Sequence, residues 1–166
     1  MNKLTVKVFN ILWFYKSPIN RVGKKESIFT FFHPLDAIKD WNKIYGSKGF
    51  IQYQFFVPNY SKEKIKFALE YLKQNRVPCF LTVIKKFRKR NPSYLSFPDE
   101  GWTLTTDIPN CIPKINQILN HLDNEIAKSG GKIYLTKDSM QSSDMFKRTY
   151  PLLENWKKLK KELDPE

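Results

Sequence analysis

The stretch GGKIYLTKD, residues 130–138, decides how the second half of this chain folds. Paired glycines commonly end a helix, because a residue without a Cβ can adopt positive φ at little cost. The apolar residues 133–135 then predict a short strand that runs towards Lys137. Such a strand would bring Tyr134 and Lys137 to one place, although a lysine at a strand exit is most often ordinary solvated surface.

Upstream of this stretch, strand and helix patterns alternate. Runs of apolar and β-branched residues predict strands at 50–57, 79–87 and 102–108. Ser61 is the expected N-cap of a first amphipathic helix, and a second helix, with apolar residues from 115 to 126, ends at the paired glycines. The order strand, helix, strand, strand, helix, strand predicts an α+β, ferredoxin-like antiparallel sheet with both helices on one face and the other face open.

The flanks of this unit have weaker patterns. Residues 1–27 form a poorly patterned leader, and residues 28–166 form the predicted domain. Within the domain, residues 28–32 have strand composition and stop at Pro34, and residues 36–45 predict a short helix that ends at Gly46. Two closing helices, at 144–150 and 152–163, are separated by Pro151.

Composition limits the class of protein without deciding its function. The 166 residues suit one ordinary domain. Cys79 and Cys111 lack CxxC spacing, so we expect two buried thiols, no metal site, and a reducing, cytoplasmic location. No signal peptide or membrane-spanning segment is predicted. The net charge of +13 fits a nucleic acid, an anionic membrane surface, an anionic substrate or an acidic partner.

Alternation along the strands separates two faces of the predicted sheet. The odd-numbered residues 51–57 should lie under the helices. The other face would carry a set of hydrogen-bonding side chains: Gln52, Gln54, Thr103, Thr105, Tyr134 and Lys85. Three aromatic residues, Phe50, Phe56 and Phe87, would border this set. It is either a polar-ligand site or the ordinary solvent-facing side of a half-exposed sheet.

Five short motifs carry a resemblance to a known family. They are FFHPLD at 31–36, WNKIYG at 41–46, GFIQYQ at 49–54, GWT at 101–103 and YLTKD at 134–138. In this order they resemble the C-terminal substrate, or cap, domain of decaprenylphosphoryl-ribose-oxidase-like enzymes. These FAD-dependent oxidoreductases belong to the vanillyl-alcohol-oxidase flavoprotein class and are related to the aldonolactone oxidases. The resemblance covers residues 28–165.

The resemblance implies a role for each matched residue. The open sheet face would cover the flavin ring and hold a sugar while its carbinol carbon gives up hydride. The substrate-binding residues would be Gln52, Gln54, Lys85, Phe87, Thr103 and Thr105. Tyr134 and Lys137 match the pair closest to the reacting centre. The lysine there can orient the substrate hydroxyl, accept its proton or stabilise charge on reduced flavin, and these three roles stay open.

The departures from the family are as informative as the matches. Thr103 and Thr105 stand where relatives can carry asparagine and cysteine, and His33, where an aromatic residue is usual, is interpreted as a packing variant. The family binds FAD through a separate N-terminal domain with glycine-rich contacts, whereas this chain has six glycines and no such loop. We therefore expect that this chain alone binds no FAD and oxidises nothing.

Three functions remain open at this point. The first is a cap domain or subunit of a FAD-dependent sugar oxidoreductase, of aldonolactone or polyprenylphosphoryl-ribose type, whose FAD-binding half is encoded separately and which could associate peripherally with a membrane. The second is a truncated, non-catalytic remnant of such an enzyme. The third is a basic ferredoxin-like nucleic-acid-binding module, ranked last because glutamines and threonines stand where RNA-binding sheets place stacking aromatics.

Overall fold

The computed structural model describes residues 3–16, 23, 25–33, 39–40, 43, 45–79, 81–137 and 140–165. The chain divides into two compact units, residues 1–49 and residues 50–166. The second unit contains the sheet and the residues of the hydrophobic core cluster.

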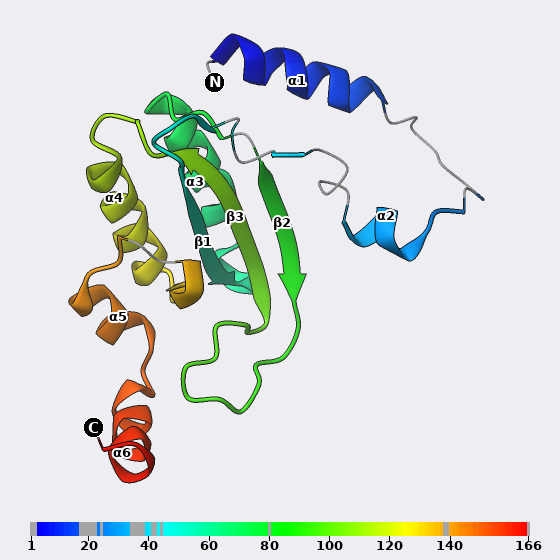
Figure 1. The fold of residues 1–166 in the computed structure, drawn as a ribbon. Helices are drawn as coiled ribbons and strands as arrows, with labels where there is room; N and C mark the ends of the chain where they lie inside the picture. The colour runs from blue at the N-terminus through cyan, green and yellow to red at the C-terminus, as the bar shows by residue number, and fades with distance from the viewer. Residues whose placement is uncertain are drawn as a thin grey trace. The chain divides into compact units, whose positions relative to one another are not determined.

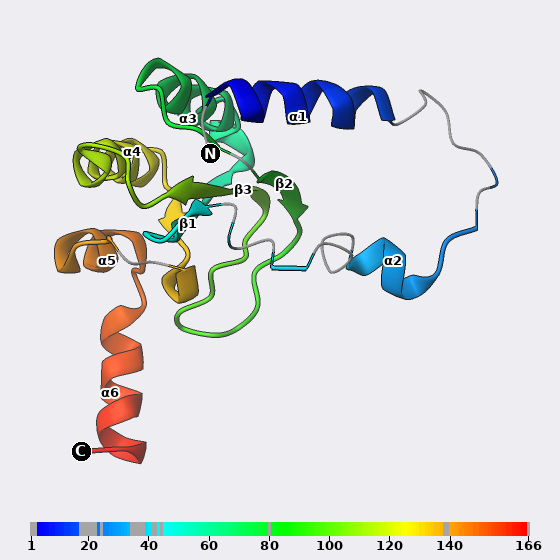
Figure 2. The same ribbon diagram turned by 45° about the horizontal axis from the view of Figure 1, so that its top comes forward.

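The second unit is built on a four-stranded antiparallel sheet (Figure 1). Its strands are β1 (Phe50–Pro58), β2 (Thr82–Phe87), β3 (Gly101–Pro109) and β4 (Lys132–Ile133), in the spatial order β2-β3-β1-β4. Helices α3 (Glu63–Gln74) and α4 (Ile115–Lys128) lie on one face (Figure 2). The predicted α+β fold, with its antiparallel sheet, is confirmed.

The core lies between this sheet face and the two helices. The side chains that alternation assigned to the helix face are all buried: Ile51, Tyr53, Phe55 and Val57. They pack with Leu104 and Ile108 of β3 against apolar residues of both helices. Burying each such side chain stabilises the fold by about 1.5–3 kcal/mol. The Tyr53 hydroxyl donates to Asp123 Oδ1 at 2.7 Å, so the polar atoms in this layer are paired as well.

The strand after the paired glycines is shorter than predicted. Gly130 has a φ of 76°, and Gly131 N–H donates to Ile126 O, so the helix ends where the glycines predict. The strand then covers only Lys132–Ile133, and Tyr134 adds one further backbone bond to Gln54 O. Lys137 lies in a 3-10 helix, η3 (Leu135–Lys137), and not at a strand exit.

Two other element boundaries differ from the prediction. Ser61 is not the N-cap of α3, because it belongs to a 3-10 turn, η2 (Asn59–Ser61), and its hydroxyl donates to Ser129 O at 3.1 Å. The serine therefore ties the start of one helix to the end of the other. β2 starts at Thr82, later than residue 79, and pairs only with β3 at the edge of the sheet.

Among its described residues, the first unit has two α-helices. Helix α1 (Lys3–Lys16) lies within the predicted unpatterned leader, and helix α2 (Ile28–Phe32) replaces a predicted strand. The Ser27 hydroxyl caps α2 by accepting from Thr30 N–H at 3.0 Å. A local cap is enough to start a helical turn, whereas a strand needs a neighbouring strand. Of the predicted helix at 36–45, residues 36–38, 41–42 and 44 lie outside the described residues, as does Pro34.

The chain closes with the two helices that the sequence predicts. Helices α5 (Ser143–Thr149) and α6 (Leu153–Leu163) confirm the prediction to within one residue at each end. Cys79 is half-buried, and burial raises the pKa of its thiol. Cys111 is exposed, so the expectation that both thiols are buried was wrong. Among the described residues, no helix combines the length and apolarity needed to cross a membrane.

Candidate functional site

The strand register brings most of the predicted site residues onto one face of the sheet, which we call the polar face. In the β1–β3 ladder, Gln52 lies opposite Asp107, and Gln54 lies opposite Thr105. The β2–β3 ladder places Lys85 opposite Thr103. Residues directly opposite each other in a ladder point to the same side. The side of β2 to which Lys85 and Phe87 belong, which the sequence left ambiguous, is thereby settled.

The polar face is covered at one end, contrary to the prediction of an open face. The loop of residues 88–100 between β2 and β3 runs over the side of the sheet opposite α3 and α4 (Figure 2). Its Phe97 is 5% exposed, and the ring centroid lies 4.5 Å from that of Tyr134, 6.0 Å from Phe87 and 6.3 Å from Phe56. An aromatic cluster therefore covers the end of the face where β1 meets β4.

Two of the predicted ligand-binding residues are used inside the protein. Gln54 is 8% exposed, and its Nε2 donates to Thr103 Oγ1 at 3.1 Å. Thr103 is fully buried, and its hydroxyl donates in turn to Phe55 O at 2.8 Å. Buried polar groups need such partners, because an unpaired one costs about 1–3 kcal/mol. This chain of bonds stabilises the sheet and leaves little of either side chain for a ligand.

The remaining predicted residues stay accessible. Gln52, Thr105, Phe87, Tyr134 and Lys137 are half-buried, and Lys85 is exposed. Gln52 Nε2 donates to the buried carboxylate Asp107 at 2.8 Å, which orients the amide on the face.

Tyr134 and Lys137 are connected through η3. Lys137 N–H donates to Tyr134 O at 3.1 Å. The 3-10 turn is itself held by the sheet, because Tyr134 N–H donates to Gln54 O at 2.9 Å. Residue 138, the last of the YLTKD motif, lies outside the described residues, as does residue 139.

The loop is anchored by a buried lysine that sequence reasoning did not single out. Lys132 is 8% exposed, its Nζ donates to Ser96 O at 3.2 Å, and it lies 3.5 Å from Asp99 Oδ2. The same ammonium lies 5.6 Å above the Phe56 ring. Burial lowers the pKa of Lys132, and the Asp99 carboxylate opposes that shift. The one sign available in the sequence was a lysine placed directly between the helix-ending glycines and the apolar residues 133–135.

The paired glycines Gly130 and Gly131 do not form a cradle for the pyrophosphate of FAD. Such a group is held by backbone N–H groups that point at it from a glycine-rich turn. Here the N–H groups of Gly130 and Gly131 donate to Ala127 O and Ile126 O at the end of α4. Within the described ranges there is also no group of three or more side chains suited to holding a metal ion.

Fold and site together define an α+β domain with one helix-covered sheet face and one hydrogen-bonding face. No protein-family model matches the chain. It is 34% identical over 165 residues to decaprenylphosphoryl-β-D-ribose oxidase of Mycolicibacterium smegmatis. An uncharacterized Streptomyces coelicolor protein, encoded in the mprA 5′ region, is 34% identical over 83 residues, 50% of this chain and 23% of that protein.

The first of these matches covers 99% of this chain and 35% of the oxidase. It confirms the resemblance to decaprenylphosphoryl-ribose-oxidase-like proteins that the sequence motifs predict. The chain spans about a third of the length of that relative.

Proposed function

We propose that this chain is the substrate-binding cap of a FAD-dependent sugar oxidoreductase of the decaprenylphosphoryl-ribose oxidase type, with the flavin held by residues outside these 166. One observation carries the proposal. A polar sheet face bearing Gln52, Thr105, Tyr134 and Lys85 occurs in a chain that matches the oxidase over 165 residues. Hydrogen-bonding side chains on a preformed sheet suit a hydroxylated substrate.

In this proposal each accessible residue contacts a different part of the substrate. The Gln52 amide, oriented by Asp107, and the Thr105 hydroxyl would bond to sugar hydroxyl groups. Tyr134 and Lys137, joined by the 3-10 turn, would stand closest to the reacting carbinol. Lys85 supplies an exposed positive charge for the phosphate of a polyprenyl-phospho-sugar. Gln54 and Thr103 would support the face from beneath it.

The decisive experiment is a chimaera. The 165 matched residues of the Mycolicibacterium oxidase are replaced by this chain, and the oxidase activity of that relative is assayed together with flavin content. We expect an active, flavin-containing protein that Lys137→Ala slows about 100-fold or more. The matched control is Lys128→Ala, because Lys128 is an exposed lysine at the end of α4. A folded, flavin-loaded but inactive chimaera would favour the alternative of a non-catalytic remnant.

Peripheral membrane association is a second proposal, and helix α1 supports it. Its large apolar side chains are exposed: Leu4, Val8, Ile11, Leu12, Trp13, Phe14 and Tyr15. The helix also carries Lys3, Lys7 and Lys16 and no acidic residue. Lysines together with exposed aromatic and aliphatic side chains are features of helices that lie on anionic interfaces. The full chain should sediment with phosphatidylglycerol vesicles, more weakly with phosphatidylcholine, and Leu12→Glu should abolish the binding.

The nucleic-acid alternative receives less support from the same face. Sheet-based RNA binding uses exposed aromatic side chains as stacking platforms. Here Phe56 is buried, and Phe87 lies against the ring of the loop residue Phe97. Weak RNA binding that is lost as the salt concentration rises is the expected result, because the net charge of +13 supplies only non-specific electrostatic attraction.

A further inference from the structure

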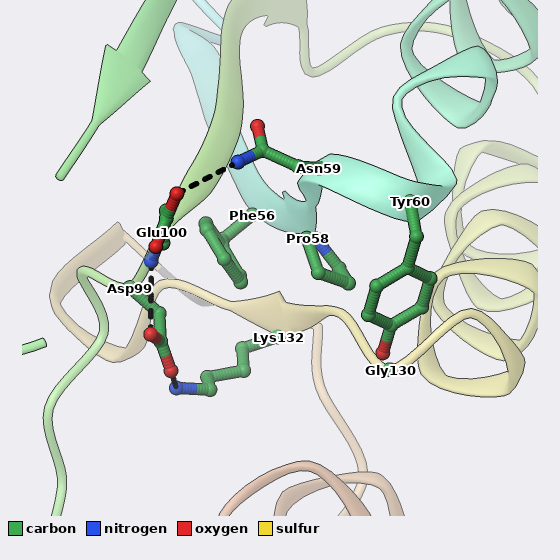
Figure 3. A pocket seen from close by; sticks show the side chains of 8 residues that line it. All are labelled: Phe56, Pro58, Asn59, Tyr60, Asp99, Glu100, Gly130 and Lys132. Atoms are coloured by element: carbon green, nitrogen blue, oxygen red, sulfur yellow. Dashed lines mark hydrogen bonds and ion pairs between the residues drawn. The ribbon is translucent and has the colours of Figure 1, made fainter. Parts of the chain in front are cut away.

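A pocket at the end of β1 shares no residue with the predicted substrate set. It has a volume of about 470 Å³, and eight residues line it: Phe56, Pro58, Asn59, Tyr60, Asp99, Glu100, Gly130 and Lys132 (Figure 3). This volume lies in the range of pockets that take small molecules, about 300–1,000 Å³. The end of β1 and the adjoining turn η2 form one side of the pocket, and the end of the loop 88–100 forms the other.

The charges around the pocket exclude most ligand classes. The carboxylates of Asp99 and Glu100 would repel an anion such as phosphate. Asp99 is paired with Lys132 at 3.5 Å, whereas Glu100 accepts a hydrogen bond from the neutral Asn59 amide at 3.3 Å and keeps its negative charge. It is the net charge of +13 on the whole chain that disfavours a cationic ligand. A neutral ligand is left.

The polar atoms of the pocket suit hydroxyl groups. A carboxylate can accept several hydrogen bonds beyond the one it already has, and a side-chain amide can donate two. The pocket therefore combines acceptors, at Asp99 and Glu100, with donors, at the Asn59 amide and the Tyr60 hydroxyl. A group that both donates and accepts, as each hydroxyl does, can bond to both kinds of atom.

The apolar part of the pocket suits the carbon skeleton of such a ligand. Tyr60 is exposed and stands on the pocket wall, with its hydroxyl beside Gly130 (Figure 3). A Cβ at Gly130 would come within 2.6 Å of that hydroxyl, so glycine is required for this position of the ring. Pro58 and Phe56 supply further apolar surface. Aromatic rings with a polar edge bind amphipathic rings through their faces.

We propose that this pocket binds a neutral polyol the size of one sugar ring, between the Tyr60 ring and the Asp99 and Glu100 carboxylates. The site is distinct from the proposed substrate-binding residues, because none of them lines the pocket. The inference does not depend on the oxidoreductase role. It would hold for a chain that only binds carbohydrate.

Nuclear magnetic resonance titration of the full chain tests the proposal. The probes are methyl glucoside, methyl galactoside, methyl mannoside and methyl xyloside, with inorganic phosphate and ethylenediamine as the anionic and cationic comparisons. We expect saturable shifts of the backbone amides of Asn59, Tyr60, Glu100 and Lys132 with at least one glycoside. The dissociation constant should be millimolar, as is usual for a small ligand with few contacts.

Two variants with exposed side chains keep the result interpretable. Tyr60→Ala should weaken glycoside binding about tenfold. Glu100→Gln should weaken it about threefold, because a charged acceptor makes the stronger hydrogen bond. Glu70→Gln, which changes an exposed glutamate on α3, should leave binding unchanged. Absence of glycoside shifts, shifts confined to other residues, or tighter binding of phosphate or ethylenediamine would each overturn the proposal.

Discussion

Phe97 is the residue on which the cover of the polar face depends. Its ring contacts those of Tyr134, Phe87 and Phe56. Phe97→Ala should lower the free energy of unfolding by about 3 kcal/mol, because it removes a buried ring and leaves a cavity. Urea denaturation measures the change. Tyr94→Ala, at an exposed position of the same loop, should change it by less than about 0.5 kcal/mol, and equal effects would contradict the assignment.

Glu125 predicts how stability depends on acid. Hydrogen bonds from Lys128 at 2.8 Å and Lys64 at 2.9 Å lower its pKa from the ordinary 4.5 to about 2. The folded state therefore holds this carboxylate ionised over a range in which the unfolded chain protonates it. Its contribution to stability is fully present above pH 4.5 and is lost as the pH falls towards about 2.

Glu125→Gln should remove that contribution. The free-energy difference between the two proteins, at most about 1 kcal/mol for a partly exposed pair, should be present at neutral pH and shrink on acidification. Urea denaturation at several pH values measures it. Glu70→Gln serves as the control, because Glu70 forms only a long surface pair with Lys66 at 3.8 Å. If the free-energy difference between the two proteins grew on acidification, the predicted direction of the pH dependence would be wrong.

At the scale of elements, the loop 88–100 and β4 depend on each other through Lys132. Lys132→Met should keep the fold, because methionine fills the buried space and the half-exposed Asp99 can be solvated. The loop should lose protection, since the bond to Ser96 O and the ion pair to Asp99 are removed. Hydrogen exchange of the amides at 94–99 should accelerate about tenfold or more.

The exposed neighbour Lys128 gives the matched control. Lys128→Met should leave exchange in the loop unchanged, because its partner Glu125 lies on α4 itself. Unchanged exchange in the Lys132 variant would mean that Phe97 alone holds the loop. The pH dependence of stability gives a second test. Burial lowers the pKa of Lys132 below 10.5, so the buried charge destabilises the folded state at lower pH. This destabilisation should disappear as the pH rises to 10.5, in the wild type and not in the Lys132→Met variant.

At the scale of the whole molecule, the second unit should fold without the first. The hydrophobic core cluster draws its buried residues from 51–133, all in the unit of residues 50–166. A chain of residues 50–166 should therefore unfold in one cooperative transition with a urea midpoint close to that of the full protein. Loss of the transition, or a large fall in the midpoint, would show that residues 1–49 contribute to the core.

The sequence by itself determined the order of elements, the helix end at Gly130 and the two faces of β1 and β3. These follow from local rules, since alternation and positive φ depend on neighbours in the chain. It also placed Gln52, Gln54 and Tyr134 on one face, in agreement with the strand register.

Only the tertiary structure decided that Phe97 covers this face, that Gln54 and Thr103 bond to each other, and that Lys132 is buried beside Asp99. These contacts join residues 33 to 49 positions apart, and no pattern within a short window records such a pairing. The short β4 has the same cause. The hydroxyl of Tyr150, the residue that follows α5, donates to Ile133 O at 2.6 Å, and the chain that was predicted to continue as a strand towards Lys137 forms a 3-10 turn.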